Sequence, residues 1–281
     1  MKSPLSSILA ALPLLASSHI LRPRSQRRVC GNENFAIPDT LKTLHSRLSS
    51  SANIAAANFS ATIPTYFHIV SSTANKDMVT DKMISDQLAV MNARYAGSGF
   101  SYNLVATDHT VNDQWASQQG DAAMQKALRK GTYGTLNIYF LTDLPTPLLG
   151  QCVFPVANPP AAALVKDGCE ILATSMPGGT MAPYNLGLTV VHEVGHWLGL
   201  FHPFQGYSCT KDSDMVADTP FQSEATYNCP VLGSKDSCPD APGVDGTSNY
   251  MDYADDACMD SFTPGQIARA GSIYTSFRAG K

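Results

Sequence analysis

The chain has 281 residues, of which 44% are hydrophobic and 15% are charged, whereas about 25% of residues are charged in an average soluble domain. This composition excludes a coiled coil, a disordered charged tail and a low-complexity linker, and the length allows one large domain or two small ones. The formal net charge of −4 argues against a nucleic-acid partner, because nucleic-acid binding needs a concentrated basic face.

The N-terminus has the pattern of an export signal. Lys2 precedes an apolar run over residues 8–16, and the small residues Ser17 and Ser18 follow it. We predict a secretory signal peptide over 1–18, because an organelle presequence would carry arginines throughout the segment. The run is too short to cross a bilayer, and no later segment approaches that length. The mature protein is therefore expected to be secreted and soluble, with no membrane partner.

Residues 19–60 are rich in Ser, Ala, Asn and Arg and lack sustained periodicity, so we interpret them as a pro-segment that precedes a folded domain over 61–281. In that domain, β-branched and aromatic residues predict strands over 62–70, 101–106 and 136–141. Thr80 is suited to cap a helix, and a short Ala-rich helix is expected near 121–130. The apolar residues of the first helix recur on one face: Ile84, Leu88, Met91 and Tyr95.

The second half of the domain is less regular. Weaker strand patterns cover 150–154 and 170–174, and residues 203–260 read as loop, rich in Gly, Pro, Asp and Cys. A loop region of this length inside a compact domain needs disulfides or metal ions. A last helix begins with Thr263 as N-cap, Pro264 at its first position and Gln266 as the capping-box partner. Its apolar residues are Ile267, Ala270, Tyr274 and Phe277. The mixture of elements predicts an α+β fold.

Seven cysteines occur in the chain: Cys30, Cys152, Cys169, Cys209, Cys229, Cys238 and Cys258. In an exported protein most of them are expected to be oxidised. Six lie after residue 150, whereas Cys30 stands alone near the N-terminus. Six cysteines allow fifteen pairings, so the count by itself leaves the connectivity open.

The stretch over 189–202 carries the chemistry. On a helix, residues four apart differ by about 40° in azimuth and about 6 Å in height, so His192 and His196 can aim their imidazoles at one point. Gly199 tolerates positive φ, which can end the helix and turn the chain so that His202 supplies a third nitrogen. Three nitrogen ligands suit Zn²⁺ and leave one tetrahedral position open for water, as in catalytic zinc sites.

Glu193 lies next to one of these histidines. Zinc lowers the pKa of a bound water towards about 7, and the Glu193 carboxylate can take that proton and pass it to a leaving amine. Acid–base catalysis of this kind contributes roughly 10²- to 10⁴-fold. The full pattern, with its five fixed positions, arises by chance on the order of once in 10⁵ chains of this length. The sequence therefore predicts hydrolysis of peptide bonds.

At these residues the sequence resembles a metzincin metalloprotease, and residues 249–253 fit the methionine turn of that group. The resemblance implies that Met251 forms a hydrophobic floor beneath the zinc and that Tyr253 helps to stabilise the tetrahedral intermediate. Within the metzincins the chain most resembles the pappalysin group, especially the secreted fungal extracellular metalloproteases. The supporting residues are Gly195, Trp197, Phe204, Gln205, Gly206 and 214–220, whereas Pro203 and Tyr207 depart from the usual pattern.

The resemblance, which covers 60–281, implies a twisted mixed sheet with a backing helix, a zinc-binding helix across the cleft, and a loop-rich lower half stapled by disulfides. The family's disulfides would pair Cys209 with Cys238 and Cys229 with Cys258, and Cys152 with Cys169 is then left as the third pair. We expect the substrate to bind as an extended chain along an edge strand, with 150–154 as the candidate.

Residues 28–31 resemble the cysteine-switch motif of some metzincin zymogens. A thiolate is a good fourth zinc ligand and would displace the catalytic water, so Cys30 is predicted to hold the enzyme latent. Two other interpretations remain open: a thiol in a discarded segment, or a disulfide partner of another molecule. Arg27 and Arg28 also form a dibasic processing site immediately before this motif.

The acidic loop region is also a candidate site for a second metal ion. Residues 209–260 include eleven acidic and two basic residues, and oxygen ligands in a disulfide-bearing loop suit Ca²⁺. Asp212, Asp214 and Asp218 are the candidate ligands. The alternative is an ordinary solvated acidic face.

These observations predict a secreted, monomeric zinc endopeptidase that acts on proteins or peptides, with His192, His196 and His202 as zinc ligands and Glu193 and Tyr253 as catalytic residues. One rival is a secreted zinc- and calcium-binding module without activity. The retained Glu193 argues against it, because a structural site needs no carboxylate beside the water. Another rival is a zinc hydrolase of non-peptide amides, which the zinc chemistry alone does not exclude.

Overall fold

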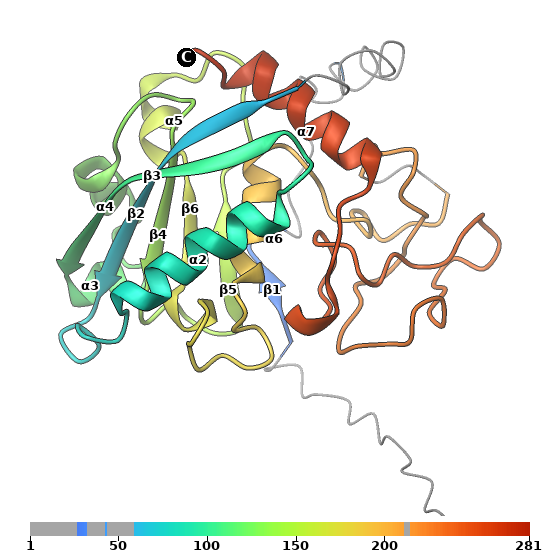
Figure 1. The fold of residues 1–281 in the computed structure, drawn as a ribbon, viewed down its shortest axis with the longest axis horizontal. Coiled ribbons are helices and arrows are strands. Elements are labelled where there is room, and N and C mark those ends of the chain that lie inside the picture. The colour runs from blue at the N-terminus through green and yellow to red at the C-terminus, as the bar shows by residue number, and fades with distance from the viewer. Residues whose placement is uncertain (1–26, 33–42, 44–58, 211–213) are drawn as a thin grey trace, which may run out of the picture.

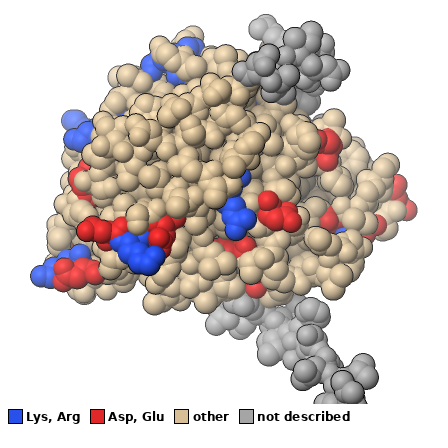
Figure 2. Space-filling view, viewed as in Figure 1, with Lys and Arg blue, Asp and Glu red and all other residues tan. Residues whose placement is uncertain are grey.

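The structure is a computed structural model, and it describes residues 27–32, 43, 59–210 and 214–281. The predicted signal peptide over 1–18 and most of the predicted pro-segment over 19–60 lie outside these residues, so those boundaries stay predictions. None of the helices in the described part of the chain is long and apolar enough to cross a membrane. On the face drawn in Figure 2, the described basic and acidic side chains are interspersed, and no basic patch covers that face.

The domain is built on a six-stranded sheet in the order β1-β5-β6-β4-β2-β3. All neighbouring strands run parallel except β5 and β6, which are antiparallel. The strand bounds are β1 Val29–Cys30, β2 Ala61–Ser71, β3 Phe100–Val111, β4 Leu136–Leu141, β5 Leu148–Cys152 and β6 Cys169–Leu172. Every residue of β4 is buried, and all but Asn137 are apolar or aromatic, as expected for a strand that is covered on both faces.

Helices cover both faces of the sheet. Their bounds are α2 Asp81–Arg94, α3 Asp113–Ala116, α4 Asp121–Leu128, α5 Ala161–Lys166, α6 Leu188–Trp197 and α7 Pro264–Phe277, with short 3₁₀ turns η3 Ala173–Ser175 and η4 Asp256–Cys258. Figure 1 shows α2 crossing one face of the sheet. The main core lies beneath α2 and α6 and joins Phe67 and Ile138 of the sheet to Met91 and Val194 of these helices. A smaller core under α4 contains Met124.

The predicted elements are largely confirmed. Helix α2 is capped by Thr80, and α7 begins with the predicted capping box of Thr263 and Gln266. Three strands differ from the predicted bounds. β5 lies two residues before 150–154, β6 ends at Leu172 before a 3₁₀ turn, and β3 continues to Val111. The short elements β1, α3 and α5 were not predicted, because each has too few residues to show a period.

Three disulfides staple the lower half and the sheet edge. Cys152–Cys169 joins β5 to β6, whereas Cys209–Cys238 and Cys229–Cys258 lie in or beside the loop region. The predicted pairing is confirmed, and the buried Cys30 forms no disulfide. Within the described part of 203–260, η4 is the only helical segment, as the loop prediction expected. Figure 1 shows this region gathered on one side of the sheet.

Candidate metal centre

Helix α6 presents two of the three predicted histidines. All ten of its residues are buried, and it ends where Gly199 adopts a φ of +89°. The Gly199 amide donates to the His196 carbonyl at 2.8 Å, and the Leu200 amide donates to the Gly195 carbonyl at 2.9 Å. These bonds close the helix end, and the positive φ turns the chain back. His202 thereby returns to the same point as His192 and His196.

The three imidazoles converge through their Nε2 atoms. The separations are 3.2 Å for His192 to His196, 3.2 Å for His192 to His202, and 3.1 Å for His196 to His202. Each Nδ1 faces a carbonyl oxygen. Nδ1 of His192 lies 2.8 Å from the Tyr250 carbonyl, and Nδ1 of His196 lies 2.8 Å from the Leu200 carbonyl. Nδ1 of His202 lies 3.0 Å from the side-chain oxygen of Gln205. Because a carbonyl can only accept, each Nδ1–H donates, and each neutral imidazole holds its lone pair on Nε2.

These residues suit a zinc ion. Burial lowers the pKa of all three histidines, to about 4 for His196 and well below the usual value for His192 and His202, where the neighbouring imidazoles lower the pKa further. Three buried lone pairs thus face one another without a proton to share. Zn–N bonds of about 2.0–2.1 Å in a tetrahedron require nitrogen separations of about 3.4 Å, close to those observed. Cys30 completes a group whose four ligand atoms all lie within 4.8 Å of one another.

Glu193 lies between this cluster and β5. Burial raises the pKa of Glu193 to about 8, although the Cys30 hydrogen bond and the charge of Arg28 lower it. The Cys30 thiol donates to Glu193 Oε2 at 3.4 Å. β5 passes so close that a Cβ at Gly150 would lie 2.8 Å from Glu193 Cγ. The carboxylate therefore faces the position where a peptide along β5 would pass.

The methionine turn packs beneath the histidines. Met251 is fully buried, and a Cβ at Gly195 would collide with its sulfur atom. This contact explains why α6 contains a glycine despite its low helix propensity. The Tyr253 ring lies 5.1 Å from the His202 ring, centroid to centroid. Its hydroxyl oxygen accepts a hydrogen bond from the Cys30 amide at 3.2 Å.

Strand β1 occupies the cleft beside these residues. It pairs in parallel with β5, with Cys30 opposite Gly150, and the Gly31 amide donates to the Gly150 carbonyl at 3.0 Å. Arg28 is buried in an ion pair with Asp256. Residues 29–31 therefore run along the first half of β5, next to the histidine cluster.

Three supporting residues were not assigned these roles from the sequence. Gln205 orients His202, Asp256 receives Arg28, and Gly195 admits Met251. In the sequence, Gln205 and Gly195 indicate only the resemblance to the family. Asp256 carried no motif, and its role depends on a partner 228 residues away in the chain.

The candidate calcium ligands are not brought together in the described residues. Asp212 lies outside them. Asp214 accepts hydrogen bonds from the Thr219 hydroxyl, and Asp218 accepts them from the Thr263 hydroxyl and the Gly265 amide. The one described cluster of three or more potential ligands is that of Cys30 and the histidines. The described residues therefore do not support a calcium site.

The mixed sheet backed by α2, the three histidines at and just after α6, and the methionine turn together define a zinc metalloendopeptidase of the metzincin type. The chain belongs to the Peptidase_M43 family, whose model, described as pregnancy-associated plasma protein-A, matches residues 133–274. An extracellular metalloprotease of Colletotrichum graminicola is 51% identical over 80% of each chain. Another, from Coccidioides posadasii, is 45% identical over 92% of this chain and 93% of its own.

Solved structures agree with this assignment. Mature mirolysin of Tannerella forsythia, in complex with a cleaved peptide, superposes with a TM-score of 0.67 at 25% identity, covering 79% of this chain and 97% of mirolysin. A promirolysin variant gives a TM-score of 0.69 at 25% identity, covering 89% of this chain and 95% of its own. The predicted family and fold are thus confirmed.

Proposed function

We propose that the protein is a secreted zinc endopeptidase in which His192, His196 and His202 hold the ion and Glu193 is the general base and acid. The observation that carries this proposal is that Glu193 packs against Gly150 of β5, while its carboxylate accepts from the Cys30 thiol, which lies with the three converging Nε2 atoms. The bound ion would act as a Lewis acid and lower the pKa of water.

The chain's own residues supply the other parts of the mechanism. Glu193 takes a proton from the attacking water and donates it to the leaving amine. Its raised pKa supports this role, since a group that titrates near the working pH both accepts and releases a proton readily. The Tyr253 hydroxyl already contacts a backbone amide in the cleft, so it lies within reach of the scissile peptide and can donate to the developing oxyanion.

The substrate is proposed to pair with β5 as an extended chain, in the place that β1 occupies. Backbone pairing of this kind holds peptides of many sequences in register. Secretion is supported by the predicted signal peptide over 1–18, by three disulfides, and by relatives that are named extracellular metalloproteases. We take 61–281 as the catalytic domain.

We further propose that residues 19–60 keep the enzyme latent through Cys30, whose thiolate would occupy the fourth position of the zinc. Cys30 lies with the three histidines, and β1 fills the edge of β5. The match to promirolysin also covers more of this chain than the match to mature mirolysin. The alternative of a discarded thiol does not explain these contacts.

Replacement of Glu193 tests the catalytic proposal. Glu193→Ala in the processed enzyme should reduce casein cleavage by at least about 10²-fold, the size of a lost acid–base catalyst, while zinc content stays near one ion per molecule. The matched control is Glu224→Ala, whose side chain is 67% exposed and which should retain full activity. Undiminished cleavage by Glu193→Ala would exclude this residue as the base.

A further inference from the structure

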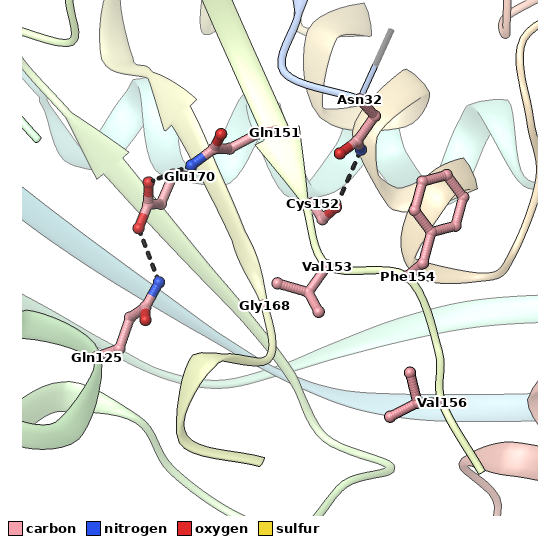
Figure 3. Close-up of a pocket in the computed structure, with 9 residues that line it drawn as sticks. All are labelled: Asn32, Gln125, Gln151, Cys152, Val153, Phe154, Val156, Gly168 and Glu170. Atoms are coloured by element: carbon pink, nitrogen blue, oxygen red, sulfur yellow. Dashed lines mark hydrogen bonds between the residues drawn. The ribbon is translucent and has the colours of Figure 1, made fainter. Parts of the chain in front are cut away.

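A cavity opens at the carboxyl end of β5, next to the histidine cluster: Phe154, which lines the cavity, lies 5.2 Å from His196, ring centroid to centroid. Its volume is about 310 Å³, and Figure 3 shows it between the end of β5, strand β6 and helix α4. The residues that line it include no lysine, arginine or histidine: Asn32, Gln125, Gln151, Cys152, Val153, Phe154, Val156, Gly168 and Glu170. We call this cavity the Glu170 pocket.

The floor of the Glu170 pocket is a buried carboxylate. Glu170 Oε2 accepts from Gln118 Nε2 at 2.8 Å and from Gln151 Nε2 at 2.9 Å, and Oε1 accepts from Gln125 Nε2 at 2.8 Å. A carboxylate can accept about four hydrogen bonds, so these three amides do not saturate it. Burial and the nearby charge of Asp121 raise the pKa of Glu170. The three hydrogen-bond partners of the Glu170 carboxylate are thus neutral amides, which do not balance its negative charge.

The glutamine amides also favour a ligand that donates hydrogen bonds. Gln125 and Gln151 direct their NH₂ groups at the carboxylate, so their carbonyl oxygens diverge from it (Figure 3). The opposite wall is apolar and consists of Val153, Phe154 and Val156. An acidic floor with an apolar wall matches a side chain that has an aliphatic stem and a charged head.

The segment from Cys30 to Asn32, which follows β5, shows how a peptide reaches the Glu170 pocket. Cys30 lies opposite Gly150 beside the histidines. Two residues later, Asn32 lines the pocket and donates from Nδ2 to the Cys152 carbonyl at 2.9 Å. Two residues of an extended chain span about 7 Å. A peptide that follows β5 therefore places a side chain at this pocket when another residue lies over the metal centre.

We infer that the Glu170 pocket is a substrate subsite that takes a lysine or arginine side chain, on the side of the scissile bond towards which the carboxyl end of β5 points. The subsite lies about two residues from the position over the metal centre, and the inference rests on the proposed peptidase function. The side chain would enter the pocket where Asn32 lies in this structure, and its cationic head would continue to Glu170.

The test uses the secreted, processed protein and a set of fluorogenic peptides. In each peptide one position is varied among Lys, Arg, Gln and Met, and the varied position is moved along the chain. At a single position, kcat/KM for Lys or Arg should exceed that for Met at least about tenfold, as expected for a charge-assisted hydrogen bond. Glu170→Gln should bring this ratio close to one.

Two further variants control for indirect effects. Asp86→Asn removes one negative charge from α2, where Asp86 pairs with the exposed Lys82, and it should keep the ratio unchanged. Val153→Arg places a competing cation at the rim of the Glu170 pocket, where Val153 is 38% exposed, and it should lower the ratio even if Glu170→Gln folds poorly.

Equal cleavage of the Lys, Gln and Met peptides, a preference for Gln over Lys, or a ratio that survives both pocket variants would overturn the subsite. Casein cleavage by the same preparations reports separately on the proposed function. A parent enzyme that cleaves casein without the basic preference disproves the subsite alone, whereas one that cleaves neither casein nor any peptide disproves both.

Discussion

His202 differs from the other two histidines in the group that orients it. His192 and His196 donate to backbone carbonyls, whereas His202 donates to the side chain of Gln205. Gln205→Ala removes this acceptor and leaves the ring less fixed. We expect zinc affinity to fall about 10- to 100-fold, as for other partners that orient metal-bound histidines. Competition with a chromophoric chelator measures this change.

Gln119→Ala is the matched control for that experiment, since Gln119 is an exposed glutamine away from the cluster. It should bind zinc as the parent does. If Gln205→Ala also bound zinc with the parent's affinity, then packing alone would orient His202, and the hydrogen bond would have no role in metal binding.

Glu170 predicts a pH dependence of stability. Burial raises its pKa in the folded state, so the folded protein favours the protonated form more than the unfolded chain does. The parent should therefore lose stability as pH rises from the ordinary glutamate pKa through the raised one. Glu170→Gln cannot ionise, so its Tm relative to the parent should increase between pH 4 and pH 8. A Tm difference independent of pH would contradict the raised pKa.

At the scale of elements, β1 should control latency. Its two residues pair with β5, Arg28 before it is held by the ion pair with Asp256, and Cys30 lies with the three histidines. Cys30→Ser in the full-length secreted protein removes the proposed zinc ligand, so the unprocessed chain should cleave casein. Initial rates before processing, with intact chain length checked on a gel, provide the measurement. Equal latency of variant and parent would refute the switch.

The elements that sequence analysis located are those with a repeating pattern or a cap. Helix α2 shows four apolar residues at helical spacing, and α7 carries a capping box, so local chemistry sets both starts. The three histidines could be predicted because one helix and one glycine turn hold them within 11 residues of sequence.

Contacts between distant segments could not be predicted in this way. β1 has two residues and depends on pairing with β5, more than 100 residues away. The Glu170 pocket draws on α4, β5 and β6, and no local pattern connects Gln125 to Glu170. In each case the determining interaction is tertiary packing between distant segments. Neither the hydrophobic periodicity of the sequence nor the secondary-structure propensity of its residues reports on such packing.

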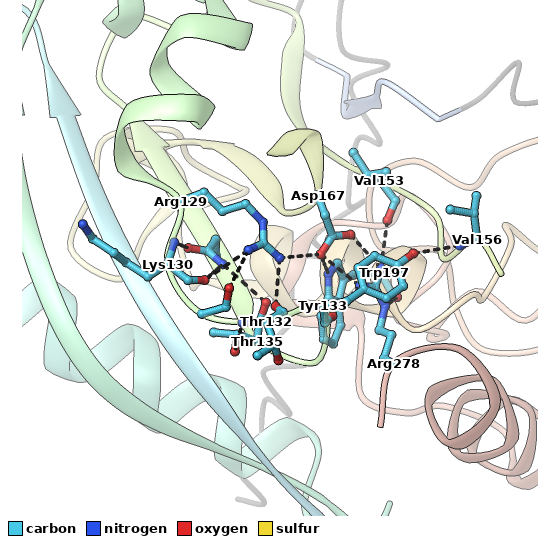
Figure 4. A network of polar contacts seen from close by, with 12 residues as sticks. Arg129, Lys130, Thr132, Tyr133, Thr135, Val153, Val156, Asp167, Trp197 and Arg278 are labelled. Atoms are coloured by element: carbon cyan, nitrogen blue, oxygen red, sulfur yellow. Dashed lines mark hydrogen bonds and ion pairs between the residues drawn. The ribbon is translucent and has the colours of Figure 1, made fainter. Parts of the chain in front are cut away.

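At the scale of the whole molecule, one buried ion pair connects the C-terminal end of the chain to helix α6. Arg278 donates to both carboxylate oxygens of Asp167, at 2.9 and 3.0 Å. It also donates to the carbonyl of Trp197, the last residue of α6, at 3.0 Å, and to that of Tyr133 at 3.2 Å. Figure 4 shows how these contacts join α6, α7 and the segments before β4 and β6. The cation thus lies at the negative end of the α6 dipole.

Breaking this pair should destabilise the whole domain. Asp167→Asn leaves Arg278 buried without its counter-charge, which costs about 3–5 kcal/mol of unfolding free energy, measured by denaturant titration with disulfides intact. Asp86→Asn, on the surface, should stay within about 0.5 kcal/mol of the parent. Asp167→Asn combined with Arg278→Met should cost less than the sum of the single changes, because the second substitution removes the nearer of the two arginines, Arg278 and Arg129, that pair with Asp167. Strictly additive losses would show that the two residues do not act as a pair.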